Sequence, residues 1–234
     1  MFYSIFNLSD MFIGHFGIGL GAKKINPKIS LGTLFLAAQF LDLLWPSFIL
    51  LGWEHLKIVP GITKLTPLKF TDFPISHSLF MALIWGGGFG FVYFLIKRNF
   101  SGSILLGLIV VSHWALDLFV HIRDLPLFPG SDIYFGFGLW NHKLVAIVLE
   151  ALIFIIGLAF YLKSTKALNK IGKYGFWGLI LFLVLIYISN LFGSPPPNVK
   201  AIAWAGELQW IFIIWAYWID KNRVIKENAA VNMK

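Results

Sequence analysis

The sequence has no cysteine among its 234 residues. This absence excludes disulfide bridges, thiolate zinc sites, iron–sulfur clusters and a cysteine nucleophile. Charged residues are also scarce, at 13% of the chain, whereas a water-soluble domain carries about 25%. Because so few charges cannot cover the surface of a soluble globule of this size, the composition excludes a soluble enzyme and a disordered chain. We therefore expect lipid to surround most of the protein.

Hydrophobic residues make up 58% of the chain and gather into long apolar runs. Six runs approach the ~20 residues that a membrane-spanning helix needs, and they cover 30–52, 76–96, 101–122, 138–162, 174–192 and 201–219. Polar residues interrupt the N-terminal segment, which predicts a shorter helix over about 11–21, capped by Ser9 or Asp10, that spans or re-enters the membrane. The sequence therefore predicts one all-α domain, a polytopic transmembrane bundle of six to seven helices.

Basic residues divide between the two sides of the membrane if successive helices alternate in direction. Thirteen lysines and arginines fall on the side that carries Lys23, Lys97 and Lys163, and six fall on the side of the loops 53–75 and 123–137. Positive side chains favour the cytoplasmic side. We therefore expect a cytoplasmic C-terminus with a polar tail over 220–234, and both long loops outside. The same bias explains the net charge of +8 without a nucleic-acid partner.

Ionisable residues inside the apolar runs are the strongest functional signal, because each one costs about 2.5–3.5 kcal/mol in a bilayer. The ones that stand out are His15, Asp42, His77, His113, Asp117, His121, His142 and Glu150, and the last two runs contribute only Glu207. In a continuous helix His113, Asp117 and His121 share one face, since they are four residues apart. Imidazole and carboxylate groups on one face suit a divalent metal, with zinc first and manganese or iron as alternatives.

Several of these residues also have ordinary structural interpretations. Asp42 is either a ligand or a protonated acid bonded to a neighbouring helix, and Pro46 predicts a bend just past it. His77 opens a helix with Ser76 as its cap, and it is either a ligand or an interfacial histidine. Glu150 lies in an otherwise apolar helix and is hard to explain without a cation or proton partner.

The polar residues of the two long loops are expected to have smaller parts. Arg123 and Asp124 bind an anionic group of a substrate, support the ligands, or form a surface pair. The other polar residues of these loops are expected to be solvated: Glu54, His55 and Asp72. The glycines around His15 and in the segment 86–90 predict close packing between helices.

Four pieces of the sequence resemble a family of bacterial inner-membrane proteins described as membrane-bound metal-dependent hydrolases. They are His15, Phe40-Leu41-Asp42, Ser76-His77-Ser78-Leu79 and Ser112-His113-Trp114-Ala115-Leu116-Asp117. The resemblance covers the metal-site helices within 1–162, whereas the helices within 174–219 carry no motif of the family. It implies a metal-dependent hydrolase of the bacterial inner membrane, in a family whose substrate is generally unassigned.

The order of the ionisable residues is also similar to the ligand order of all-helical zinc phospholipases C and their nuclease relatives. That resemblance implies one metal held by Asp42, His77, His113 and Asp117. It also implies that Asp117 bridges to a second metal near His15, and that another position is formed by His121, His142 and Glu150. The sequence departs from that pattern in two places: His142 and Glu150 are eight residues apart rather than four, and an N-terminal tryptophan ligand is missing.

These observations lead to the hypothesis of a membrane-embedded hydrolase with one or two divalent metals. A metal-activated water would cleave an amphiphilic phosphoester or another lipid-linked substrate. His15, Asp42, His77, His113 and Asp117 are the expected ligands. His121 or Glu150 would complete the ligand shell or act as general base, and Asp117 is the third expected catalytic group. The alternative is a metal-ion or proton transporter or channel that uses the same cluster, and a purely structural metal site is a third interpretation. Apolar cytoplasmic halves of the helices favour a pocket open on one side only.

Overall fold

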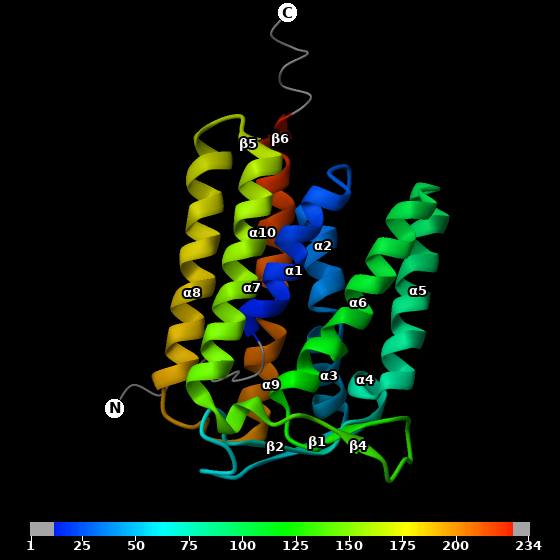
Figure 1. The fold of residues 1–234 in the computed structure, drawn as a ribbon, viewed down its shortest axis with the longest axis vertical. Helices are drawn as coiled ribbons and strands as arrows, with labels where there is room; N and C mark the ends of the chain where they lie inside the picture. Colours follow the sequence, from blue (N-terminus) through cyan, green and yellow to red (C-terminus); the bar gives the residue numbers. More distant parts are fainter. Residues whose placement is uncertain (1–11, 227–234) are drawn as a thin grey trace, which may run out of the picture.

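The computed structural model describes residues 12–226 (Figure 1). Its long helices run along the longest axis of the molecule, side by side. The α-helices, long and short, are α1 (Phe12–Ile25), α2 (Leu31–Ala38), α3 (Phe40–Leu51), α4 (Pro74–His77), α5 (Leu79–Lys97), α6 (Phe100–Val120), α7 (Lys143–Ser164), α8 (Phe176–Phe192), α9 (Val199–Glu207) and α10 (Trp210–Asp220). Two further short helical segments are η1 (Leu139–Asn141) and η2 (Ile171–Gly175). The predicted all-α class is confirmed for this part of the chain.

Short strands form three antiparallel pairs at the two ends of the bundle. The strands are β1 (His55–Ile58), β2 (Leu68–Asp72), β3 (Leu125–Pro126), β4 (Tyr134–Phe135), β5 (Thr165–Ala167) and β6 (Arg223–Ile225). The pairs β1–β2 and β3–β4 lie at one end, which we call the hairpin end, and β5–β6 lies at the other, which we call the C-terminal end (Figure 1). The two long loops therefore share one end, as the predicted alternation of helices requires.

Five helical segments within residues 12–226 are long and apolar enough to cross a membrane, or six if the bent pair α2–α3 counts as one span. Many of their large apolar side chains point outward, including Leu83, Phe91 and Ile155. Long helices with exposed apolar faces are typical of an integral membrane protein. The segment predicted as a short first helix forms α1, which has 14 residues in the described chain. Ser9 and Asp10, its expected caps, lie outside the described residues.

The apolar run over 30–52 is broken at Gln39, a position that the sequence does not mark. Its two halves, α2 and α3, meet at 56° around Gln39. Helix α3 continues through Pro46, the residue where the sequence predicts a bend. Gln39 is fully buried and donates a side-chain hydrogen bond (3.1 Å) to Gln209, which lies in the break between α9 and α10. The bend between α2 and α3 therefore faces the short turn that joins α9 to α10 inside the bundle.

Two other helix ends differ from the prediction. Ser78, rather than Ser76, caps α5 by accepting a hydrogen bond from the amide three residues later. Helix α6 ends at Val120, and His121 has an extended backbone (φ −60°, ψ 146°). The predicted helical face therefore carries His113 and Asp117 but not His121.

Glycines bring neighbouring helices close together, as the sequence predicts. A Cβ atom at Gly157 of α7 would overlap the carbonyl oxygen of Gly17 in α1, and a Cβ at Gly17 would lie 2.7 Å from the Cα of Phe154. Helices α5 and α6 pack in the same way, since a Cβ at Gly86 would lie 2.7 Å from the carbonyl oxygen of Gly107. The contact between α1 and α7 fixes the position of the helix that carries His15.

Candidate metal centre

Five of the predicted ligands meet inside the bundle, although they come from four different helices. Two groups of three can each offer ligand atoms within 4.8 Å of one another, and both groups contain His113. The first group is His15, His113 and Asp117, and the second is Asp42, His77 and His113. All five side chains are buried. The cluster lies where α1, α3, α4 and α6 come together.

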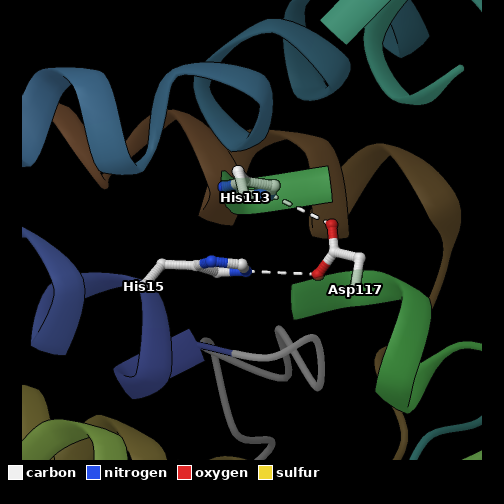
Figure 2. A group of neighbouring side chains, drawn as sticks. All are labelled: His15, His113 and Asp117. Carbon is white, nitrogen blue, oxygen red and sulfur yellow. Dashed lines mark hydrogen bonds and ion pairs between the residues drawn. The ribbon is translucent and has the colours of Figure 1, made fainter. Parts of the chain in front are cut away.

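The first group is arranged around the carboxylate of Asp117 (Figure 2). One oxygen, Oδ1, lies 3.2 Å from Nε2 of His15, and the other, Oδ2, lies 3.2 Å from Nε2 of His113. The two imidazole rings are stacked, with their centroids 3.6 Å apart and an angle of 4° between the planes. Helix α6 supplies both His113 and Asp117 because the two residues are separated by one turn.

The second group is arranged around the carboxylate of Asp42. Its Oδ1 atom lies 3.4 Å from Nε2 of His113 and 3.6 Å from Nε2 of His77. His77 also reaches the first group, since its Nε2 lies 3.6 Å from Oδ2 of Asp117. The bend at Gln39 places Asp42 in the first turn of α3, beside the site. Within the described residues, the ion pairs of Asp42 and Asp117 are all with histidines. A bound cation would therefore offset two buried carboxylates.

Neighbouring groups fix the orientation of these side chains. Nδ1 of His113 donates to the carbonyl oxygen of Ala38, the last residue of α2 (2.7 Å). Because a carbonyl can only accept, Nδ1 carries the proton and Nε2 is turned toward the carboxylates. The indole of Trp45 donates to Oδ1 of Asp42 (3.0 Å). Hydrogen bonds of this kind behind metal ligands orient the ligands and tune the metal.

One atom tests whether the residues fit a metal. Nε2 of His113 is buried and has no hydrogen-bond partner, although carboxylate oxygens of Asp42 and Asp117 lie within 3.4 Å of it. An unpaired buried nitrogen is costly unless something else satisfies it. Three imidazoles and two carboxylates are the nitrogen and oxygen ligands that zinc, manganese and iron accept. The donor set therefore fits a divalent transition metal.

Glu54 lies in the loop after α3 and contacts Ser76, the neighbour of His77. The sequence predicts that Glu54 is solvated, but it is only 1% exposed. Its carboxylate accepts hydrogen bonds from the amides of Ile75 and Ser76 and from the Ser76 hydroxyl. Burial raises the pKa of the Glu54 carboxyl to about 7, against the effect of these hydrogen bonds. Nothing in the local sequence pattern marks Glu54, because its partners are more than twenty residues away.

The structure places His121 and the two residues predicted beside it outside both groups. His121 is buried between aromatic rings, including that of Trp140 (4.0 Å between centroids), and its Nδ1 bonds to Oδ1 of Asp124 (2.9 Å). The predicted surface pair of Arg123 with Asp124 is thus replaced by the pair of Asp124 with His121, and Arg123 is exposed. Asp124 also lines a pocket of about 170 Å³ at the hairpin end.

Glu150 and His142 likewise lie outside both groups. Glu150 is fully buried, and its carboxylate accepts hydrogen bonds from the amide of Ile13 in α1 (3.2 Å) and the hydroxyl of Tyr187 in α8 (3.4 Å). These contacts supply the partner that its burial requires and join three helices. His142 precedes α7 and is exposed. In the described part of the chain, neither residue belongs to a ligand group that contains His113.

An apolar pocket of about 620 Å³ lies between α1, α6 and α7, and its walls do not include the five ligands. Gly17 and Ile18 of α1 and Ile109 of α6 contribute to its walls. These residues lie within about one helical turn of His15 and His113. From there its walls continue along α1 to Ile25, the last residue of that helix.

Comparisons of the chain with models of known protein families, with curated proteins and with solved structures find no match. The function is therefore inferred from the residues and their geometry. These residues define a buried histidine–carboxylate centre within an integral-membrane helical bundle.

Proposed function

We propose that this protein is a metal-dependent hydrolase of the bacterial inner membrane, with zinc as the first choice of metal and a cytoplasmic C-terminus. The observation that carries the proposal is the convergence of five buried ligand side chains around His113, whose Nε2 atom has no hydrogen-bond partner. When bound, a divalent metal lowers the pKa of its water toward 7 and so supplies a hydroxide nucleophile. The hydrolase class and the bacterial inner membrane are carried over from the resemblance of the ligand-bearing pieces to membrane-bound metal-dependent hydrolases, a family that no model match identifies.

The residues of the centre have distinct tasks in this proposal. His15, Asp42, His77, His113 and Asp117 are the ligands. Of the three expected catalytic residues, Asp117 belongs to the ligand groups. His121 is instead hydrogen-bonded to Asp124, and Glu150 accepts a hydrogen bond from the backbone of α1. We therefore assign His121 and Glu150 to the framework of the site and Asp117 to the centre itself.

An amphiphilic phosphoester is the substrate class that the surroundings favour. The pocket between α1, α6 and α7 is lined by apolar residues such as Ile18 and Ile109, close in sequence to the ligands His15 and His113. Such a pocket suits a hydrocarbon chain, while the ligands provide a polar site for the scissile group. The lipid bilayer is then both the solvent of the protein and the source of its substrate.

The decisive experiment is elemental analysis of the protein purified without chelator. The wild type should carry stoichiometric metal, and His113→Ala and Asp117→Ala should lose it. His55→Ala is a matched control, because His55 is an exposed histidine on β1 outside both groups. Metal-free wild type, or equal metal in all four proteins, would refute the proposal. Phosphoester and carboxylester lipids in nanodiscs then test the reaction.

A metal-ion or proton transporter is the second candidate, and the interrupted helices favour it. The break between α2 and α3 meets the break between α9 and α10 through Gln39 and Gln209, and the carbonyl of Ala38 at this break holds His113. Broken helices that meet at an ion site are common in transporters. Metal uptake by proteoliposomes without hydrolysis of any lipid ester would select this function over the hydrolase.

A further inference from the structure

A chain of hydrogen bonds links the hairpin-end loop to the metal centre. It begins at Glu54, which follows α3, and passes through the hydroxyl of Ser76 to the imidazole of His77. Oγ of Ser76 lies 2.6 Å from Oε2 of Glu54 and 2.8 Å from Nδ1 of His77. All three side chains are buried. On its far side, Nε2 of His77 faces Asp42 and Asp117, each at 3.6 Å.

The direction of this chain follows from the number of protons available. A serine hydroxyl has one proton to donate, and an ionised carboxylate can only accept. If Ser76 donates to Glu54, its oxygen must accept from His77, so Nδ1 of His77 carries the proton. The lone pair of His77 then lies on Nε2, the atom that faces the two carboxylates.

We propose that Glu54 is a positioning residue of the metal centre: acting through Ser76, it holds His77 in the Nδ1–H tautomer and so leaves Nε2 free to bind a metal. The consequence for metal binding rests on the proposed function, whereas the tautomer itself is a property of the metal-free protein. The same tautomer of His113 is fixed independently by the carbonyl of Ala38. Both histidines thus present Nε2 to Asp42.

A merely structural role for Glu54 would need only one of its oxygens. Oε1 accepts from the amides of Ile75 (2.8 Å) and Ser76 (2.7 Å), and these two bonds already attach the loop to the first turn of α4. Oε2 is used separately, for the hydroxyl that contacts His77. The division between the two oxygens indicates a second task beyond holding the loop.

Glu54→Gln separates the two roles because it keeps the size and shape of the side chain. Its amide oxygen must face the two backbone amides, so its NH₂ group faces Ser76 and donates to Oγ. The Ser76 hydroxyl is then free to donate to Nδ1 of His77, and the tautomer should reverse to Nε2–H. Ser76→Ala removes the link and should leave His77 without a fixed tautomer, while the bonds to the backbone amides persist.

The test is imidazole ¹⁵N NMR of metal-free protein labelled at histidine, at pH 8, with His77→Gln used to assign the signal. We expect Nδ1–H in the wild type, Nε2–H in Glu54→Gln and a mixture in Ser76→Ala. Glu207→Gln is the matched control, because Glu207 accepts a similar bond from Ser47 (2.6 Å) that leads to no ligand. Nε2–H in the wild type, or an unchanged tautomer in a folded Glu54→Gln, would overturn the proposal.

Zinc titration of the same proteins separates this proposal from the proposed function. We expect Glu54→Gln and Ser76→Ala to bind zinc about 10–100-fold more weakly than the wild type, as other partners of metal-bound histidines do when removed, and Glu207→Gln to bind it unchanged. Equal zinc affinity in all four proteins would refute the positioning role. A wild type that binds no zinc but has Nδ1–H at His77 would refute the hydrolase and leave the tautomer assignment standing.

Discussion

Two buried carboxylates in this bundle differ in what surrounds them. Asp117 and Glu150 are 2% and 0% exposed, and each lies within a long membrane-spanning helix. The oxygens of Glu150 are satisfied by an amide and a hydroxyl, from Ile13 and Tyr187. Those of Asp117 face imidazoles, and the neighbouring Nε2 of His113 is left without a hydrogen bond. Burial alone therefore does not indicate a metal site, and the proposed centre rests instead on an unsatisfied nitrogen among converging imidazoles and carboxylates.

The largest expected effect comes from neutralising the two carboxylates in matched variants. Asp117→Asn should weaken zinc binding by more than about 100-fold, since loss of an outer partner of a ligand already costs about 10–100-fold. Glu150→Gln should change zinc affinity by less than about threefold, because its contacts lie elsewhere. Isothermal titration in detergent measures both. An equal loss of zinc affinity in the two variants would show that the sites of Asp117 and Glu150 do not differ in metal binding.

Glu54 extends the comparison to a buried carboxylate with a raised pKa. Because its pKa rises from 4.5 unfolded to about 7 folded, the folded state binds the proton more tightly, and ionisation opposes folding. Its contribution to stability is present below pH 4.5 and is lost as pH rises through 7. The unfolding free energy of wild type minus Glu54→Gln should therefore fall between pH 5 and 8, by at most about 3 kcal/mol. Parallel pH profiles of thermal unfolding would contradict this.

A substitution at the contact between α1 and α7 should affect both carboxylate sites, because α1 carries His15 as well as Ile13. Gly157→Ala would place a Cβ against the carbonyl of Gly17, so we expect a loss of about 2 kcal/mol in stability and weaker zinc binding. In Gly88→Ala the new Cβ has nothing within 4 Å. This control should gain up to about 1 kcal/mol from helix propensity. Denaturant unfolding distinguishes the two.

The smallest expected effect is on stability in Glu150→Gln. One acceptor oxygen remains, and the loss of charge at the amide of Ile13 should lower the unfolding free energy by about 1 kcal/mol. Tyr187→Phe, which removes the other donor to Glu150, should have a similar effect. Zinc content should remain that of the wild type in both. A large fall in zinc content in either would place Glu150 among the residues of the centre.

The comparison also shows which features could be predicted from the sequence. His15, Asp42 and Asp117 stand out because ionisable residues are rare in apolar runs, and the structure brings them together. Whether an ionisable residue in such a run binds an ion or only its neighbours depends on contacts far along the chain. Glu150 meets Ile13 at a separation of 137 residues, and no spacing rule reports such a pairing.

Helix ends are the other feature that the sequence did not determine. The repeat of four residues from His113 to His121 predicts one continuous face, but α6 stops at Val120 and His121 turns to Asp124. In the same way the 56° break between α2 and α3 lies at Gln39, whose side chain donates to Gln209, 170 residues away in the sequence. Tertiary contacts decide where a helix stops, while local spacing only indicates where it can run.

The contact between His113 and the carbonyl of Ala38 has a consequence for mutational studies. The acceptor belongs to the main chain, so every amino acid at position 38 supplies the same oxygen. A saturation scan would therefore rank Ala38 by side-chain size alone and would overlook its role. Substitutions of Gln39 that straighten the bend would instead move that oxygen. The role of the Ala38 carbonyl would therefore appear in variants of Gln39 rather than in variants of Ala38.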